Sequence, residues 1–225
     1  IHRLLQVYDS LNGEIRACKR SQESTLWLAA LDTISTRWVP RAVAQLKEEY
    51  PHITVSVISG SPMQVDNWLR DGSVEIGVTD RRWTGAELDW TKLVDDPFLA
   101  VLPPDSDAPD PMPADYLSGK AVIIPDYGTN TDTTRVFTRA GVEPAYTDDR
   151  LNNRSVLAAV AAGLGSTVFS RLELDYYAQQ NLTVRAIDPP CLRELGVAMR
   201  PAVKNNPVAR SLLRALRRAA ADDIA

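Results

Sequence analysis

Short apolar runs alternate with helical patterns along most of this chain. Three runs typical of buried strands lie at residues 25–31, 53–58 and 74–79. Between them apolar residues recur at spacings of three and four, which predicts one helix ending near Tyr50-Pro51 and another ending at Asp71-Gly72. Strands that alternate with helices through short connections indicate a parallel α/β sheet.

The middle of the chain interrupts this alternation and then resumes it. Residues 88–102 predict two strands with no helix between them, and residues 103–113 contain five prolines, which indicates a loop or rigid connector. A second α/β series follows, with strands expected at 121–124, 145–147, 166–169, 183–187 and 195–199, and helices ending at 140, at 162 and, after a start at 207, at 220. The chain therefore predicts two α/β lobes, with a ligand crevice outside the carboxyl ends of their strands.

The first residues carry a heptad-like pattern. Apolar side chains at spacings of 3, 4, 3 and 4 are Ile1, Leu4, Tyr8, Leu11 and Ile15. This spacing is typical of a coiled coil, and one amphipathic surface helix explains it equally well. Gly13 weakens either helix by about 1 kcal/mol relative to alanine.

Composition and charge narrow the function classes. Hydrophobic residues make up 44% and charged residues 24%, which excludes a disordered chain. The 25 Lys and Arg against 29 Asp and Glu give a net charge of −4, so this stretch alone is a poor nucleic-acid binder. Two cysteines and two histidines match no zinc spacing, and we expect no metal, no cofactor and no membrane span. The chain begins at Ile1 without a signal-peptide profile, which is typical of a fragment.

Polar side chains gather where the predicted helices begin. Ser, Thr and Asn recur after the strands, at 33–36, 59–61, 129–131 and 152–155. Helix N-termini attract anions, so these loops suit a carboxylate ligand, although the same residue types are ordinary helix caps. Arg81 follows the third strand and either pairs with such a ligand or is an exposed loop charge. Basic residues on the closing helix form either a partner-binding stripe or a solvated face.

Five segments in order resemble one known family. They are TISTRWVP at 33–40, LKEEYPHITV at 46–55, WLRDGSVEIGV at 68–78, DPFLAVLP at 96–103 and VLAAVAAGLG at 156–165. Together they resemble the effector-binding domain of a LysR-type transcriptional regulator, from about residue 25 to about residue 216. The sequence departs from the family at Glu75, at Phe169-Ser170 and in the acidic stretch 106–113.

The resemblance implies an α/β fold of two Rossmann-like lobes joined by crossover strands, like type 2 periplasmic binding proteins. Residues 1–20 are then the end of a linker helix, lobe I is 24–98 plus 200–225, and lobe II is 99–199. A winged helix-turn-helix outside this chain supplies DNA binding. A small-molecule effector, with no metal or cofactor, is expected between the lobes. The implied effector residues are Thr33, Ser35, Thr36, Ser59, Ser61, Arg81, Thr129, Asn130, Asn153 and Phe169.

The function expected from these features is ligand-gated control of transcription in the cytoplasm by a homodimer or tetramer. In the predicted dimer, the first helix (residues 38–50) of one copy pairs antiparallel with a lobe II helix of the other. Trp38 is predicted to lie on that first helix, near the dimer surface. A secreted solute-binding protein of a transporter shares the fold and is the alternative. An enzyme on this scaffold is the weakest hypothesis, because the predicted loops contain no pair of a nucleophile and a general base, and no metal-binding cluster.

Overall fold

The computed structural model of this protein describes residues 25–125, 132–177 and 181–224. They divide into two compact units, which are treated separately below. Unit 2 is Asp96–Arg193, and unit 1 contains the described residues before and after that segment. The heptad pattern of residues 1–15 lies outside the described residues, as do Thr129 and Asn130.

Unit 1 is built on three parallel strands. They are β1 (Thr25–Ala30), β2 (Thr54–Ser59) and β3 (Ile76–Asp80), and they lie in the order β2-β1-β3. The chain leaves them into helix α2 (Asp32–Glu49), helix α3 (Pro62–Arg70) and the short turn η1 (Arg81–Trp83), respectively. The parallel α/β arrangement predicted from the alternating pattern is therefore confirmed.

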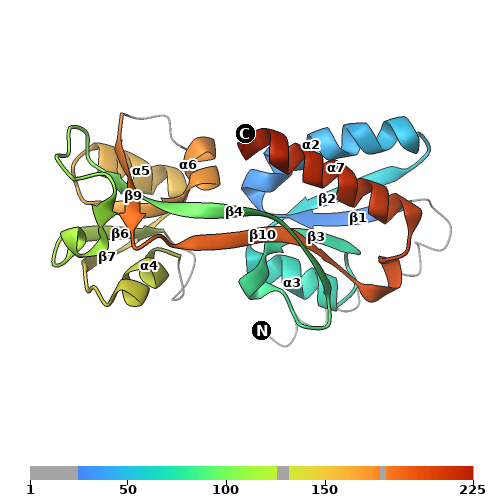
Figure 1. Ribbon diagram of the computed structural model, residues 1–225, viewed down its shortest axis with the longest axis horizontal. Helices are drawn as coiled ribbons and strands as arrows, with labels where there is room; N and C mark the ends of the chain where they lie inside the picture. Colours follow the sequence, from blue (N-terminus) through green and yellow to red (C-terminus); the bar gives the residue numbers. More distant parts are fainter. Residues whose placement is uncertain (1–24, 126–131, 178–180, 225) are drawn as a thin grey trace. The chain divides into compact units, whose positions relative to one another are not determined.

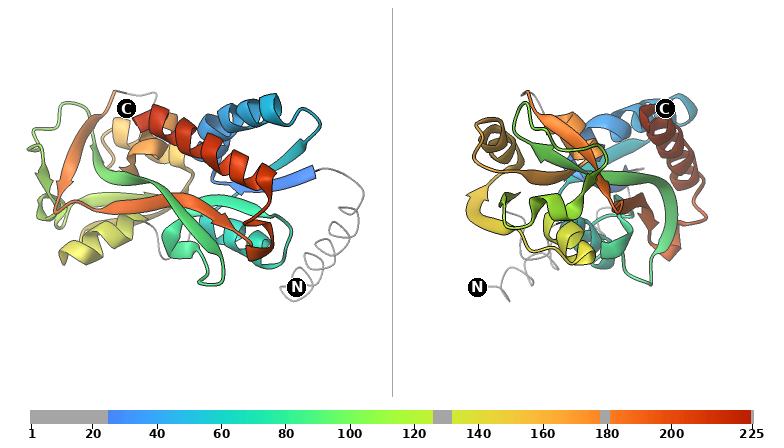
Figure 2. Two further views of the ribbon diagram at one scale, coloured as in Figure 1. Left: turned by 45° about the vertical axis from the view of Figure 1, so that its right-hand side comes forward. Right: turned by 60° about the vertical axis from the view of Figure 1, so that its left-hand side comes forward.

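Helices cover both faces of this sheet. Helix α2 and the closing helix α7 (Pro207–Ile224) pack together on one face, and α3 lies on the other (Figures 1 and 2). A short turn, η3 (Pro201–Val203), precedes α7. The buried positions of α2 recur at helical spacing, and they include Ile34, Trp38, Val39, Ala42 and Leu46. Sequestering this apolar face from water stabilises the helix in its place.

Two long strands pass from one unit into the other. Strand β4 (Asp89–Leu102) and strand β10 (Leu192–Met199) are neighbours in the sheet, and each contains a boundary between the units. The prediction of two strands over 88–102 is wrong, because β4 is one strand of 14 residues. The polar pair Asp95-Asp96 and Pro97 suggest a break, yet the backbone continues through them in extended form.

Unit 2 surrounds the other ends of these strands. Strands β8 (Thr167–Ser170) and β9 (Thr183–Asp188) pair antiparallel with β4. The remaining elements are β5 (Met112–Pro113), η2 (Ala114–Leu117), β6 (Ala121–Pro125), α4 (Asp132–Ala140), β7 (Ala145–Leu151), α5 (Asn153–Ala161) and α6 (Arg171–Tyr177). Strands β6 and β7 form a separate parallel pair. In the described part of the chain, no helix has the length and apolarity needed to span a bilayer.

Candidate functional site

The three parallel strands of unit 1 end at one edge of the sheet. Ala30 of β1 lies opposite Ser59 of β2, and it also lies opposite Val78 of β3. Because parallel strands present their carboxyl ends together, this edge gathers the starts of α2, α3 and η1. It carries the predicted site residues Thr33, Ser35, Thr36, Ser59, Ser61 and Arg81. We call it the carboxyl edge of unit 1.

The turn at the end of β2 needs a residue without a side chain. Gly60 donates its N–H to the carbonyl of Ala30 at 3.1 Å, which ties this turn to β1. A Cβ atom at residue 60 would lie 2.7 Å from the ring of Trp68, so the indole packs directly on the glycine. This contact sets where α3 begins relative to β1.

The hydroxyl of Ser61 is already used by its own helix. The Gln64 N–H donates to Ser61 Oγ at 3.3 Å, and the Ser61 N–H donates to Gln64 Oε1 at 2.9 Å. Pro62 follows at the first helical position, where its missing N–H costs nothing. This reciprocal capping box satisfies the first turn of α3, so the capping alternative describes Ser61 in this structure.

The start of α2 is different, because its N-cap is an apolar residue. Leu31 offers no side-chain acceptor, and the helix begins at Asp32. The capping alternative therefore does not describe the polar residues at 33–36. Ser35 Oγ donates to the carbonyl of Asp32 at 2.8 Å, and Thr36 Oγ1 donates to the same carbonyl at 3.1 Å. Because Leu31 is apolar, the N-cap supplies no side-chain acceptor to the amides of the first turn.

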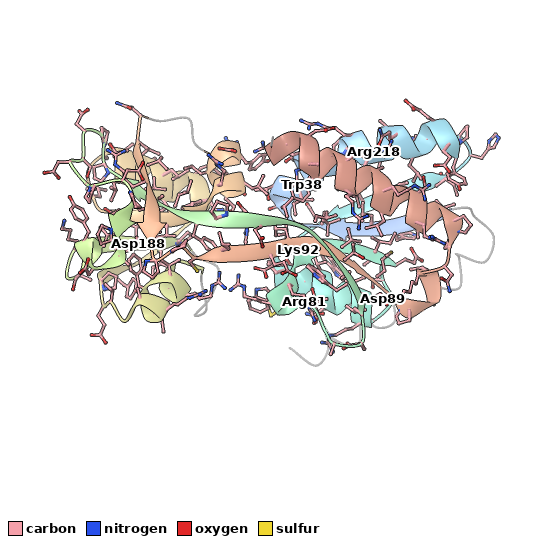
Figure 3. The ribbon with its side chains drawn as sticks, in the orientation of Figure 1. Trp38, Arg81, Asp89, Lys92, Asp188 and Arg218 are labelled. Carbon is pink, nitrogen blue, oxygen red and sulfur yellow. The ribbon has the colours of Figure 1, made fainter. Side chains whose placement is uncertain are left out.

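The first turns of α2 are braced from the other side by α7. Trp38 Nε1 donates to Asp223 Oδ2 at 2.9 Å, and Arg37 donates to Asp223 Oδ1 from Nε at 3.2 Å and from Nη2 at 2.9 Å. Trp38 is fully buried, so its side chain is not part of an exposed surface, and a dimer contact of this helix stays a prediction (Figure 3 labels Trp38). Its indole N–H needed a buried acceptor, and a residue 185 positions away in sequence provides it.

Two neighbouring arginines follow β3 and have different surroundings. Arg82 pairs with the buried carboxylate of Asp80, with an Nη2–Oδ2 distance of 2.5 Å. Arg81 is exposed, donates to the carbonyl of Thr84 at 3.1 Å and lies 5.6 Å from the ring centre of Trp90 (Figure 3). Among the described residues Arg81 has no carboxylate partner, so its charge is available to an anion. Sequence reasoning missed Asp80, although an aspartate directly after a buried strand is a recognisable signal.

In unit 2, the described candidates are buried or support a helix cap. Asn152 caps α5 by accepting the Ser155 N–H at 3.0 Å, and Asn153 beside it is 7% exposed. Phe169 is 2% exposed and packs with Val101 and Val156 in the core. In the structure, the Phe169 side chain therefore fills the interior of this unit.

A shallow cavity of about 460 Å³ lies between α2 and α7. Its lining includes Glu48, Glu49, Arg214 and Arg218 (Figure 3 labels Arg218). Glu49 accepts a hydrogen bond from Ser211 and lies 3.5 Å from Arg214, and the hydrogen bond from Ser211 lowers the pKa of Glu49. Glu49 and Arg214 pair with each other, and the groove is separate from the carboxyl edge. No cluster of three metal-ligating side chains occurs within the described ranges.

Two α/β units linked by crossover strands define a two-lobed ligand-binding class of protein, and the comparisons with known proteins narrow that class. The sequence matches the LysR substrate binding domain over residues 19–221, and the chain belongs to that family. It is the effector-binding domain of a LysR-type transcriptional regulator. The transport-receptor alternative is not favoured.

Relatives and solved structures agree with this assignment. The "Probable HTH-type transcriptional regulator LrrA" of Synechococcus elongatus is 25% identical over 222 residues, which are 97% of this chain and 74% of that protein. The CcmR regulatory domain of Synechocystis PCC6803 in complex with 2-PG superposes with a TM-score of 0.72 at 22% identity, over 86% of this chain and 96% of that one. The BenM effector binding domain with its effector benzoate superposes with a TM-score of 0.73 at 16% identity, over 88% of this chain and 93% of that one. These likenesses support the type 2 periplasmic-binding-protein fold.

Proposed function

We propose that this domain senses a small molecule with an anionic group and thereby controls transcription. The anion is held at the carboxyl edge of unit 1, by the start of α2 and the charge of Arg81. Preference of the ligand for one conformation of the domain shifts its population and so changes the regulator's output. DNA binding belongs to a winged helix-turn-helix that precedes this domain in the whole cytoplasmic regulator, and the domain itself catalyses no reaction.

The observation that carries the proposal is the contrast between two helix starts at the same edge. Helix α3 satisfies its first turn with Ser61 and Gln64, whereas the N-cap of α2 provides no side-chain acceptor. The N-terminus of an 18-residue helix carries a partial positive charge that favours an anion. Thr33, Ser35 and Thr36 lie in the first turns of that helix, and the Ser35 and Thr36 hydroxyls would have to turn away from the Asp32 carbonyl to donate to such a ligand.

The ligand class is supported by the similar domains. BenM is described with its effector benzoate, a carboxylate, and the CcmR domain was crystallised with 2-PG. Contributions from Thr129, Asn130, Asn153 and Phe169 of unit 2 to the same ligand stay a prediction.

The test is a titration of the purified domain with benzoate, 2-PG and a panel of small carboxylates and phosphates, read by thermal shift and calorimetry. At least one of these anions is expected to bind. Asp32 lies in the first turn of α2 and opposes an anion there, so Asp32→Asn should tighten binding. The Arg81→Gln substitution should weaken it. If no anion of the panel binds, or if neither substitution changes affinity, the proposal is wrong.

Ser61 provides a matched control at the neighbouring helix. The Ser61→Ala substitution removes the α3 cap and should cost about 1 kcal/mol of stability while leaving anion affinity unchanged. A bulky substitution such as Ser61→Phe should abolish binding without unfolding the domain, because it fills the edge beside α2. An unchanged titration for Ser61→Phe would remove residue 61 from the site.

We also propose that the domain forms a homodimer, within a dimeric or tetrameric regulator, in which residues 38–50 of one copy pair antiparallel with a unit 2 helix of the other. The edge position of β2 supports an interface beside α2, because an edge strand is open to pairing and its Val57 is 43% exposed. Sedimentation equilibrium should give the dimer mass. A monomer mass that does not change with concentration would contradict this proposal.

A further inference from the structure

A buried ion pair lies where both crossover strands enter unit 2. Asp96 is the first residue of that unit on β4, and Arg193 is its last residue on β10. Their side chains are 1% and 3% exposed. Arg193 donates from Nε to Asp96 Oδ2 at 2.8 Å, and its Nη2 also lies 2.8 Å from that oxygen. The guanidinium therefore holds one strand to the other through one hydrogen bond from Nε and a close ion-pair contact from Nη2, both to the same carboxylate oxygen.

The same two side chains reach a third segment of unit 2. Asp96 Oδ1 accepts the Leu172 N–H at 3.1 Å, at the start of α6. Arg193 Nη1 lies 3.4 Å from Glu173 Oε1. Glu173 Oε2 in turn accepts the Ser170 hydroxyl at 3.0 Å. These contacts form one continuous polar network from β8 through α6 to both crossover strands.

This network fixes residues 169–173, which we call the β8–α6 corner. The corner carries Phe169, one of the residues expected to take part in effector binding. Separating two polar groups that are buried away from water costs much free energy, because neither group can bind water instead. A buried network therefore favours one geometry over small displacements. The neighbouring backbone adds to it, because the Phe98 N–H donates to the carbonyl of Cys191 at 2.9 Å. The corner and the two strands should thus behave as one rigid element.

We propose that Asp96 and Arg193 are positioning residues that lock the β8–α6 corner to both crossover strands. A displacement of the corner is then passed to the strands that lead to unit 1, instead of being absorbed locally. That an effector causes this displacement rests on the proposed function, whereas the lock itself does not, and it can be tested without a ligand.

The experiment is hydrogen–deuterium exchange of the whole ligand-free domain, read by mass spectrometry. In the Asp96→Asn/Arg193→Met double variant both fully buried charges are removed, and Glu173, which also loses Arg193, is 27% exposed and keeps its hydrogen bond from Ser170. Amides of the corner and of both strands near residues 96 and 193 should exchange at least about tenfold faster, together and by similar factors, as expected when one cooperative unit loses local stability. Amides of α2 and α7 should be unchanged.

A second arginine–carboxylate pair supplies the matched control. Arg37 and Asp223 join α2 to α7 within unit 1, so Arg37→Met/Asp223→Asn should accelerate exchange there and leave the crossover strands unchanged. The Arg193→Lys substitution keeps the charge, loses the two-point contact and should give the same pattern as the double variant with a smaller factor; it carries the test if the double variant does not fold.

Two results would overturn the lock. In one, the corner exchanges faster while the strands keep their protection, so that the two are separate units. In the other, every peptide of the domain accelerates equally, which is global destabilisation alone. Failure of the anion titrations described above would leave this result unaffected, because no ligand is present.

Discussion

The two crossover strands are held differently at their two ends. At the unit 2 end, Arg193 and Asp96 are 3% and 1% exposed and form a hydrogen-bonded network. At the unit 1 end, Lys92 and Glu194 are 46% and 37% exposed and lie 3.6 Å apart. Both ends contain an ion pair between the same two strands. Their contributions to stability differ because water screens the exposed pair, whereas the buried pair is removed from water and depends on its partners within the protein.

At the unit 1 end, side-chain packing holds the two crossover strands together. The ring of Trp90 on β4 lies against the backbone of β10 at Gly196, where a Cβ would be 2.5 Å from both the ring and the carbonyl of Thr91. Trp90 Nε1 donates to Glu194 Oε1 at 2.9 Å. One end of the crossover thus relies on buried charge, and the other relies on an aromatic side chain over a glycine.

Removing one partner of the buried pair should have the largest effect. The Arg193→Met substitution leaves the Asp96 carboxylate buried without its cation and should cost about 3–5 kcal/mol in urea unfolding. The Asp96→Asn/Arg193→Met double variant should lose clearly less, because the two fully buried charges are removed together. Equal losses for the single and the double variant would mean that the pair is not coupled.

Crowding the glycine at the other end should have an intermediate effect. In Gly196→Ala the new methyl group meets a backbone carbonyl, which cannot turn aside as a side chain can. We expect a loss of about 1–3 kcal/mol, together with a changed near-ultraviolet signal as the Trp90 ring moves. A loss within about 0.5 kcal/mol, the range of neutral surface changes, would show that the strands separate easily here.

Removing the exposed cation should have the smallest effect. Lys92 is half-exposed and pairs with Asp95 at 2.7 Å, and the hydrogen bond to Asp95 raises its pKa. Because the folded-state pKa is raised, this contribution is present below the unfolded-state pKa and is lost as pH rises through the folded value, in the alkaline range. The contribution is therefore present near neutral pH, but water screens this exposed pair, so Lys92→Ala should lower the unfolding midpoint there only slightly at low salt and less at high salt. A clear loss at low salt would mean that this end also depends on charge.

Much of unit 1 is predictable from sequence because its signals are local. The strands near 25–31, 53–58 and 74–79 and the helix between the first two are set by short-range periodicity, and the parallel order of these strands brings their ends to one edge. The Ser61-x-x-Gln64 spacing carries a capping signal that is equally local.

The parts that sequence reasoning missed depend on distant partners. Asp96 looks like a strand-breaking residue until Arg193, 97 positions later, accounts for its burial. Trp38 looks like a surface aromatic until Asp223 supplies its acceptor. Helix α6 (Arg171–Tyr177) was not predicted, because its short sequence is held in place by Asp96 from another element. Leu31 as the N-cap of α2 follows from its burial, which overrides the preference for a polar cap.

The contact of Asp223 with Trp38 and Arg37 also bears on how the protein is made. Unit 2 is one continuous stretch, whereas unit 1 joins residues before Asp96 to residues after Arg193. During synthesis the chain emerges from its N-terminal side at about 5–20 residues per second. All of unit 2 can thus be synthesised before Asp223, which accepts the hydrogen bond from the Trp38 indole. In the nascent chain we expect unit 2 to fold first. Unit 1 is completed only after α7 has been synthesised and can pack on α2.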